Sequence, residues 1–137
     1  MQANGVGYLA GRVLLSVIFI LSGFGKIPHF SAVADGLRQT GWPAATFLIA
    51  LSIAIEIGCG LLLLTGFKAR YAALVLVAWL IPVTLTFHNF WAYGGAEQQG
   101  QMINFLKNLA IMGGLLVLAT SSAATGRRHV DSVGAAK

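Results

Sequence analysis

Apolar residues occur along this chain in four long runs, separated by short polar segments. The runs cover about residues 6–27, 44–66, 71–93 and 101–120, and each approaches the roughly 20 residues that a helix needs to cross the hydrocarbon of a bilayer. Only a helix or a closed barrel satisfies its backbone hydrogen bonds in hydrocarbon, and runs of this length favour helices. The pattern therefore predicts an all-α fold, a polytopic membrane four-helix bundle over residues 1–122.

Proline and glycine residues mark the ends of these runs. Pro28 ends the first run because proline has no N–H to continue a helix, and Gly66 is expected to terminate the second. Since residues 67–70 alone separate the second run from the third, these two helices are expected to form an antiparallel hairpin. Pro82, inside the third run, is expected to kink that helix rather than break it. Residues 31–39 are expected to form a short interfacial helix.

Closely spaced glycines predict tight contacts between helices. Gly7 and Gly11 form a Gly-x-x-x-Gly pair, and Gly58 and Gly60 offer a second surface of small residues. Such residues let membrane helices approach closely, because no side chain separates their backbones. The glycines are interpreted as packing residues without a chemical role.

The composition excludes several classes of protein. The chain is 57% hydrophobic and 9% charged, whereas about a quarter of residues are charged in soluble domains, so no soluble catalytic module is expected. The net charge of +5 comes mostly from short loops and the tail, which argues against nucleic acid as a partner. The single cysteine, Cys59, cannot form an intrachain disulfide or a Cys-x-x-Cys pair. It is interpreted as a packing residue, and dithiol chemistry within one chain is excluded.

The basic residues predict how the bundle is oriented. With four spans, both termini share a side with the loop between the second and third runs, and that side carries Lys68, Arg70, Arg127, Arg128 and Lys137. On the other side, Arg38 is the one clear loop cation. Cytoplasmic loops carry the excess of Lys and Arg, so both termini are predicted to be cytoplasmic. Residues 123–137 are expected to form a polar, basic and poorly ordered cytoplasmic tail. The predicted location is the bacterial inner (plasma) membrane, crossed several times.

Glu56 is the most informative residue of the sequence, because it lies near the middle of the second run. An acidic side chain at that depth costs about 2.5 to 3.5 kcal/mol on insertion scales, so a cation, a proton or a ligand has to compensate it. Depths counted at about 1.5 Å per residue make Lys107 and Arg12 equally good candidate partners. Lys26, close to a helix end, is expected to snorkel to the membrane surface. Glu56 is interpreted as part of a binding site in preference to a purely structural ion pair.

Each predicted span carries one polar stripe, and such stripes turn inward in hydrocarbon. The four stripes contain Arg12, Ser16 and Lys26; Ser52 and Glu56; Thr84 and His88; and Asn104, Lys107 and Asn108. His88 has two interpretations of equal weight, a ring hydrogen-bonded to Thr84 or Asn89, or a proton carrier. Two deep candidate ligands, Glu56 and His88, are too few for a closed metal site, so no metal is expected.

Short motifs spread over the four runs carry a family resemblance. In chain order they are Gly11-Arg12, Ser22-Gly23 with Lys26, Glu56 with Gly58 and Gly60, Lys68-Ala69-Arg70, Phe87-His88, and Asn104-Phe105-Leu106-Lys107-Asn108. This ordered combination, over about residues 11–118, resembles the DoxX family of small four-helix membrane proteins. The family includes a subunit of a thiosulfate:quinone oxidoreductase and members associated with membrane oxidoreductase complexes in oxidative and thiol stress. The resemblance therefore implies the fold and a role in redox chemistry.

The leading functional hypothesis is an integral membrane subunit of a redox system, performing quinone-linked oxidoreduction of a small anionic or sulfur-containing substrate. Glu56 and His88 would exchange protons as a quinone is reduced. Substrate binding is assigned to Arg12, Lys26, Lys107 and Asn108. Quinone would be a co-substrate, and no covalently bound cofactor is expected.

Two alternatives stay open at the level of sequence. A non-catalytic scaffold would use the polar centre to lock helix packing while its outer surface recruits a redox or stress-response partner. A small-solute transporter would need an oligomer, because four helices are few for alternating access. The expected partners are the lipid bilayer, quinone, other membrane or peripheral redox proteins and further copies of the chain.

Overall fold

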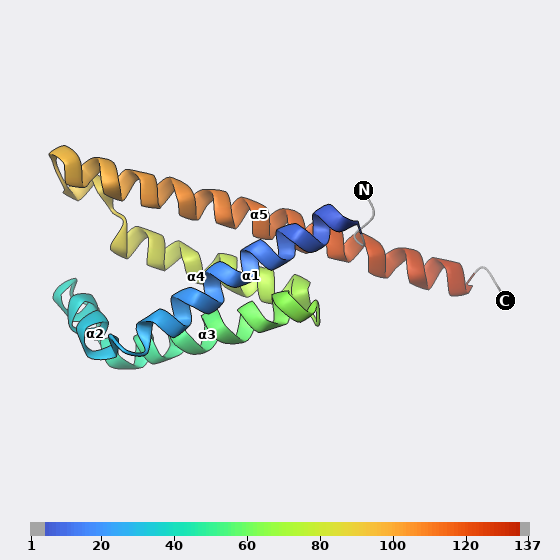
Figure 1. Ribbon diagram of the computed structural model, residues 1–137, viewed down its shortest axis with the longest axis horizontal. Helices are drawn as coiled ribbons and strands as arrows, with labels where there is room; N and C mark the ends of the chain where they lie inside the picture. The colour runs from blue at the N-terminus through green and yellow to red at the C-terminus, as the bar shows by residue number, and fades with distance from the viewer. Residues whose placement is uncertain (1–4, 135–137) are drawn as a thin grey trace.

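The computed structural model describes the backbone of residues 5–134 and the side chains of residues 5–121. Within the described backbone all regular structure is helical, and Figure 1 shows how the helices follow one another. They are α1 (Val6–Lys26), α2 (Phe30–Gln39), α3 (Ala45–Thr65), α4 (Ala69–Phe87), the 3-10 helix η1 (Phe90–Ala92) and α5 (Gly95–Gly134). Four helices of the described range are long and apolar enough to cross a membrane. The predicted all-α architecture with four spans is confirmed.

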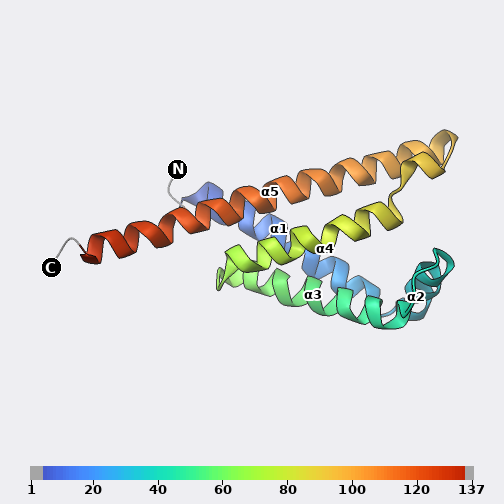
Figure 2. The same cartoon turned by 180° about the vertical axis from the view of Figure 1, so that it is seen from behind.

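The four long helices associate as two pairs, α1 with α3 and α4 with α5. The pairs are joined by the α3–α4 hairpin, which lies at the end of the bundle where α1 begins (Figures 1 and 2). Both views show the pairs separating toward the opposite end, where α2 packs on α3 and η1 packs on α5. The bundle is therefore closed at one end and open at the other.

Gly66 ends α3 and starts the turn into α4, as predicted. Its φ of 83° lies in the left-handed region, where a side chain would be strained and glycine is not. Its N–H donates to the carbonyl oxygens of Leu62 and Leu63 at 3.0 and 3.2 Å. A Cβ built on Gly66 would collide with Nη1 of Arg12, so this guanidinium lies directly against the turn. The expected antiparallel hairpin is confirmed.

The short helix forms and Pro82 does not break α4, but two other boundaries differ. α2 covers the expected segment, and α4 runs unbroken through Pro82. The chain leaves α4 at His88 and forms η1, where a continuous helix to Tyr93 was expected. α5 begins at Gly95, with Glu97 in its first turn, where a negative charge favours helix formation. The helix also continues to Gly134, so the backbone of residues 123–134 is helical where an irregular segment was expected, and residues 135–137 of that segment lie outside the described residues.

Two hydrophobic cores hold the bundle together. The larger one fills the closed end, and Leu63, Leu76 and Leu115 are completely buried there. The smaller one consists of Ala34, Leu37, Ala45 and Ile49 and fixes α2 on α3. Because the helix pairs separate between these cores, side chains do not fill the space between them.

Two glycines set the contact between α1 and α3. A Cβ on Gly23 would lie 2.6 Å from Cγ1 of Ile57, and a Cβ on Gly60 would lie 2.7 Å from Cγ1 of Ile20. The same Cβ on Gly60 would be 3.3 and 3.4 Å from backbone atoms of Ile20 and Ser16. These contacts leave no room for a methyl group, so the two backbones meet at Gly23 and Gly60.

The other predicted glycine contacts are wrong within this chain. Apart from chain neighbours and the backbone of the same helix, no described atom lies within 4 Å of a Cβ built on Gly7, Gly11 or Gly58. The spacing of glycines shows that a close approach is available on a helix face. It does not show which face a neighbouring helix covers, because that depends on where the polar and apolar residues of all four helices meet.

Gly60→Ala is expected to destabilise the protein by about 1 to 3 kcal/mol, because the added methyl group overpacks a contact with backbone atoms. Gly58→Ala is the matched control on the same helix and faces open space. It is expected to leave stability unchanged or slightly raised, since alanine favours helices over glycine. Thermal unfolding of the two purified variants in one detergent measures the difference. Equal unfolding temperatures would contradict the assigned contact.

Candidate functional site

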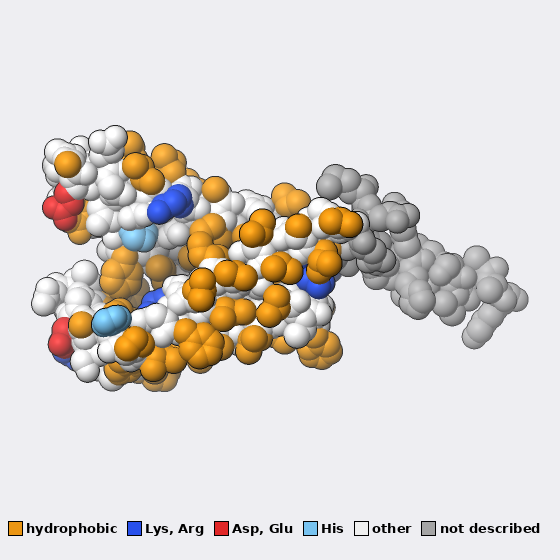
Figure 3. All heavy atoms as spheres, viewed as in Figure 1, with side chains coloured by type: hydrophobic (Ala, Val, Ile, Leu, Met, Phe, Trp, Pro, Cys, Tyr) orange, Lys and Arg blue, Asp and Glu red, His pale blue; other side chains and the backbone are white. Residues whose placement is uncertain are grey.

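A pocket of about 530 Å³ lies between the two helix pairs. Figure 3 shows the surface hollowed between the pairs at the open end of the bundle. The walls are mainly apolar and include Ile18, Phe19, Leu37, Ile49, Leu80, Val83, Phe87 and Ile111. The polar side chains at the pocket are Ser22, Lys26, Ser52, Glu56, Trp79, Thr86, His88 and Asn108. An apolar cavity of this size with a few polar groups is typical of a small-molecule site.

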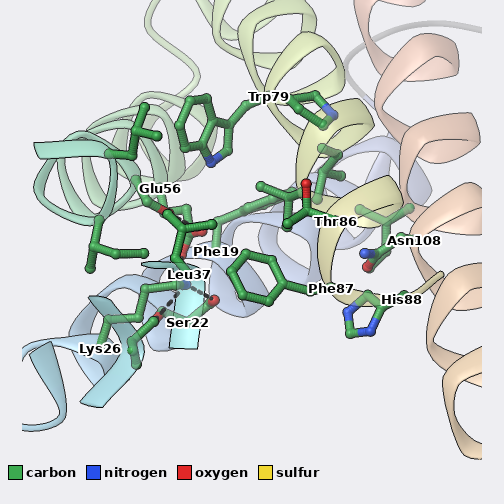
Figure 4. A pocket seen from close by; sticks show the side chains of 18 of the residues that line it. Phe19, Ser22, Lys26, Leu37, Glu56, Trp79, Thr86, Phe87, His88 and Asn108 are labelled. Atoms are coloured by element: carbon green, nitrogen blue, oxygen red, sulfur yellow. Dashed lines mark hydrogen bonds and ion pairs between the residues drawn. The ribbon is translucent and has the colours of Figure 1, made fainter. Parts of the chain in front are cut away.

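A buried ion pair forms one wall of the pocket. Nζ of Lys26 lies 2.6 Å from Oε2 of Glu56, and the two side chains are 22% and 7% exposed. Lys26 also donates to Oγ of Ser22 at 2.8 Å and to the Ser22 carbonyl at 3.3 Å (Figure 4). The Ser52 hydroxyl donates to Oε1 of Glu56 at 3.0 Å. All three ammonium hydrogens and both carboxylate oxygens therefore have partners within the protein.

The identity of this cation corrects the sequence-based expectation. Neither candidate partner of Glu56, Arg12 or Lys107, forms an ion pair with it among the described side chains. Arg12 lies at the closed end of the bundle, and Lys107 is exposed on α5 outside the pocket lining. The cation is Lys26, which was expected to snorkel away from the membrane interior.

Two features of α1 explain why Lys26 reaches Glu56. A Cβ on Gly23 would lie 3.3 Å from Cβ of Glu56, so the last turn of α1 lies beside the middle of α3. The depth estimate had assumed that the outer ends of α1 and α3 lie at the same level. The contact shows that they do not. In addition, side chains on an α-helix tilt toward its N-terminus, and Lys26 follows this rule by folding back to Ser22. Its ammonium group consequently points into the bundle.

Polar groups of α4 and α5 form the opposite wall. Nδ1 of His88 lies 2.9 Å from Oε1 of Gln101, a geometry in which the imidazole donates to the amide oxygen. Asn108 donates through Nδ2 to Oγ1 of Thr84 at 3.0 Å. The ring of His88 is therefore held by Gln101, and not by Thr84 or Asn89 as one interpretation expected.

Trp79 contributes an unpaired donor to the pocket. Its Nε1 is buried and has no hydrogen-bond acceptor among the described residues. Figure 4 shows the nitrogen edge of the indole turned toward the side of the pocket where Glu56 lies. A buried donor without an acceptor costs about 1 to 3 kcal/mol, so this position favours a ligand or water that carries an acceptor. Sequence reasoning missed Trp79, although an indole N–H in the middle of a span was a usable signal.

The structure brings together four of the six predicted site residues. Glu56, His88, Lys26 and Asn108 line the pocket, whereas Arg12 and Lys107 do not. Within the described part of the chain, no three His, Cys, Asp or Glu side chains lie close enough to hold a metal ion. The half-buried Cys59 packs against the larger core, in agreement with its interpretation as a packing residue.

Comparison with known proteins places this architecture in a family. The family model named DoxX matches residues 7–89. The chain is 35% identical over 118 residues to the inner membrane protein YqjF of Escherichia coli (strain K12), covering 86% of this chain and 85% of that protein. It is 28% identical over 117 residues to the inner membrane protein YphA of the same organism, covering 85% and 84%. No solved structure matches. The chain belongs to the DoxX family and is a multi-pass inner membrane protein.

Proposed function

We propose that this protein is the membrane subunit of a quinone-linked redox system and that its pocket binds the quinone head group. The observation that carries the proposal is the unpaired indole N–H of Trp79, which faces an ion pair across an apolar cavity. A quinone combines carbonyl oxygens, which accept hydrogen bonds, with an apolar ring and tail. The chemistry of the cavity matches these three properties.

The polar groups of the pocket lie on two walls, as a quinone requires. On one wall are Lys26 and Glu56 from α1 and α3, and on the other are Thr86 and His88 from the α4 side. The two carbonyl oxygens of a quinone project from opposite edges of its ring. One oxygen would accept from the unpaired indole N–H of Trp79, and the other would be oriented toward His88.

Reduction of a quinone to a quinol consumes two electrons and two protons. In the proposed system, the electrons come from a partner oxidoreductase that oxidises a small anionic or sulfur-containing substrate. The protons pass through side chains of this chain, because His88 and the Lys26–Glu56 pair are titratable groups on opposite walls. A positioned acid of this kind typically accelerates proton transfer by about 10² to 10⁴-fold.

Quinone binding is tested with the purified protein in lipid nanodiscs, titrated with a short-chain benzoquinone and followed by calorimetry. Wild-type protein is expected to bind one quinone with a saturable isotherm. Trp79→Phe is expected to weaken binding by about tenfold, the value of one hydrogen bond to a buried donor, while its unfolding temperature changes little.

Trp91→Phe is the matched control, because Trp91 is exposed and packs on Phe90 and Phe105 outside the pocket. It is expected to bind quinone as wild type does. Failure of the wild-type protein to show saturable binding would reject the proposed function. Equal affinity in Trp79→Phe would remove the role assigned to the indole.

A scaffold without catalysis is a second candidate, favoured by the complete pairing of Lys26 and Glu56 with each other and with Ser22 and Ser52. A centre of this kind can serve packing alone. In that case Glu56→Gln lowers stability, a partner protein still co-purifies, and the calorimetric titration shows no quinone binding. The same set of purified variants therefore separates the two functions.

A further inference from the structure

The guanidinium of Arg12 packs against its neighbours but has no counter-charge among the described residues. It lies against the backbone of Gly66 and 5.8 Å from the ring centroid of Tyr8. Its Nε is buried and has no acceptor among the described residues. The two Nη atoms differ from Nε in this respect, because each is either accessible or has a partner. No ion pair joins Arg12 to a described carboxylate. A cation held against this turn without a carboxylate partner among the described residues is available to an anion.

The surroundings of Arg12 are cationic. Lys68, in the turn after Gly66, and Arg70, in the first turn of α4, are both exposed. The carboxylates with described side chains are Asp35, which pairs with Arg38, Glu56, which pairs with Lys26, and Glu97, which lies in the first turn of α5. α2 and the start of α5 belong to the open end of the bundle (Figure 1). Three cations therefore meet at the closed end, and no described carboxylate neutralises them.

The turn between α3 and α4 lies at the end of both spans, where lipid headgroups are expected. α3 ends at Thr65 and α4 begins at Ala69, so the turn is outside both spans. Phe67 and Tyr71, which are 65% and 64% exposed, flank it. Aromatic side chains with this exposure at the end of a span are typical of the membrane interface. The phosphates of one leaflet therefore lie close to Arg12.

We propose that Arg12, together with Lys68 and Arg70, binds the phosphate group of an anionic phospholipid. A planar guanidinium presents donors in the geometry of two phosphate oxygens, and contact with Gly66 and Tyr8 limits the rotamers that Arg12 loses on binding. The lysine and the second arginine add attraction that favours a lipid with net negative charge. Arg12 thus binds lipid at the closed end, whereas it had been expected in the central site.

The proposal is tested by native mass spectrometry of delipidated protein, titrated with phosphatidylglycerol and phosphatidylcholine of identical acyl chains. Wild-type protein is expected to bind one phosphatidylglycerol more tightly than phosphatidylcholine. Arg12→Gln is expected to weaken phosphatidylglycerol binding by about tenfold or more, and Arg12→Lys by less, because lysine keeps the charge and loses the planar fork. Arg38→Gln, a cation of the open end, is the control and is expected to bind as wild type does.

Additional variants and a competition with inorganic phosphate test the proposal further. If Arg12→Gln does not fold, the double variant Lys68→Gln/Arg70→Gln replaces it and is expected to weaken binding of the anionic lipid several-fold. Wild-type affinity in both variants overturns the proposal. Inorganic phosphate is expected not to displace the lipid at millimolar concentration, and displacement would overturn the assignment to a lipid. Quinone binding is expected to be unchanged in Arg12→Gln, since Arg12 does not line the pocket.

Discussion

Lys26→Met is expected to destabilise the protein by about 3 kcal/mol, and more than replacement of both members of the ion pair. Removing the ammonium leaves the Glu56 carboxylate, which is 7% exposed, without a counter-charge. Breaking a buried pair from one side typically costs about 3 to 5 kcal/mol, whereas neutral replacement of both partners is often tolerated. Glu56→Gln is expected to cost less than Lys26→Met, because the lysine is 22% exposed and its flexible stem can move into the pocket.

A double-mutant cycle measures this coupling. Unfolding free energies are obtained for wild type, Lys26→Met, Glu56→Gln and the double variant in one detergent. The double variant is expected to be more stable than the sum of the two single effects predicts. Asp35→Asn is the control, since its pair with Arg38 is 59% exposed on both sides and surface pairs are worth about 0 to 1 kcal/mol. Strictly additive single effects would show that the pair does not act as a unit.

Val83→Trp is expected to abolish quinone binding at concentrations that saturate wild type. Val83 lines the pocket from α4, and an indole at this position would occupy space that the ligand ring needs. A steric conflict between this ring and the ligand that costs about 1 to 3 kcal/mol corresponds to about five- to 150-fold in affinity. The protein itself is expected to fold normally, because the added side chain enters a cavity and not a packed core.

Leu85→Trp is the matched control for pocket filling. Leu85 lies on the same helix, is 51% exposed and is not part of the pocket lining. The two variants therefore add the same ring to the same helix on different faces. Calorimetric titration with the short-chain benzoquinone is expected to show wild-type affinity for Leu85→Trp. Unimpaired binding in Val83→Trp would mean that quinone binds elsewhere on the protein.

The fold was predictable because hydrocarbon imposes few choices on the backbone. Apolar runs of sufficient length have to be helices in hydrocarbon. The turn after the second run needs a residue with positive φ, and glycine at position 66 indicates such a turn. The break at His88 was not predicted, because aromatic residues from Phe87 to Tyr93 continue the run past the polar pair His88 and Asn89. That break depends on η1 packing against α5, a tertiary contact without a signal in the periodicity.

The candidate site was predictable in part. Inward-facing stripes correctly grouped Glu56, His88 and Asn108, because polar side chains avoid lipid. The partner of Glu56 was not predictable by counting residues from the ends of the spans. Its position depends on how far α1 and α3 slide past one another, and Gly23 and Gly60 fix that offset through contacts between helices. Periodicity gives the face of a helix but not its axial position.

The contact of α1 with α3 also sets the geometry of the ion pair. A shift of either helix by one residue would displace Nζ of Lys26 relative to the Glu56 carboxylate by about 1.5 Å along the axis and so disturb the 2.6 Å contact between them. Gly23 and Gly60 thus fix the axial offset that brings Lys26 to Glu56. Under the proposed function, a methyl group added at Gly60, which contacts Ile20 and Ser16 and no ionisable side chain, would disturb proton transfer through the pair.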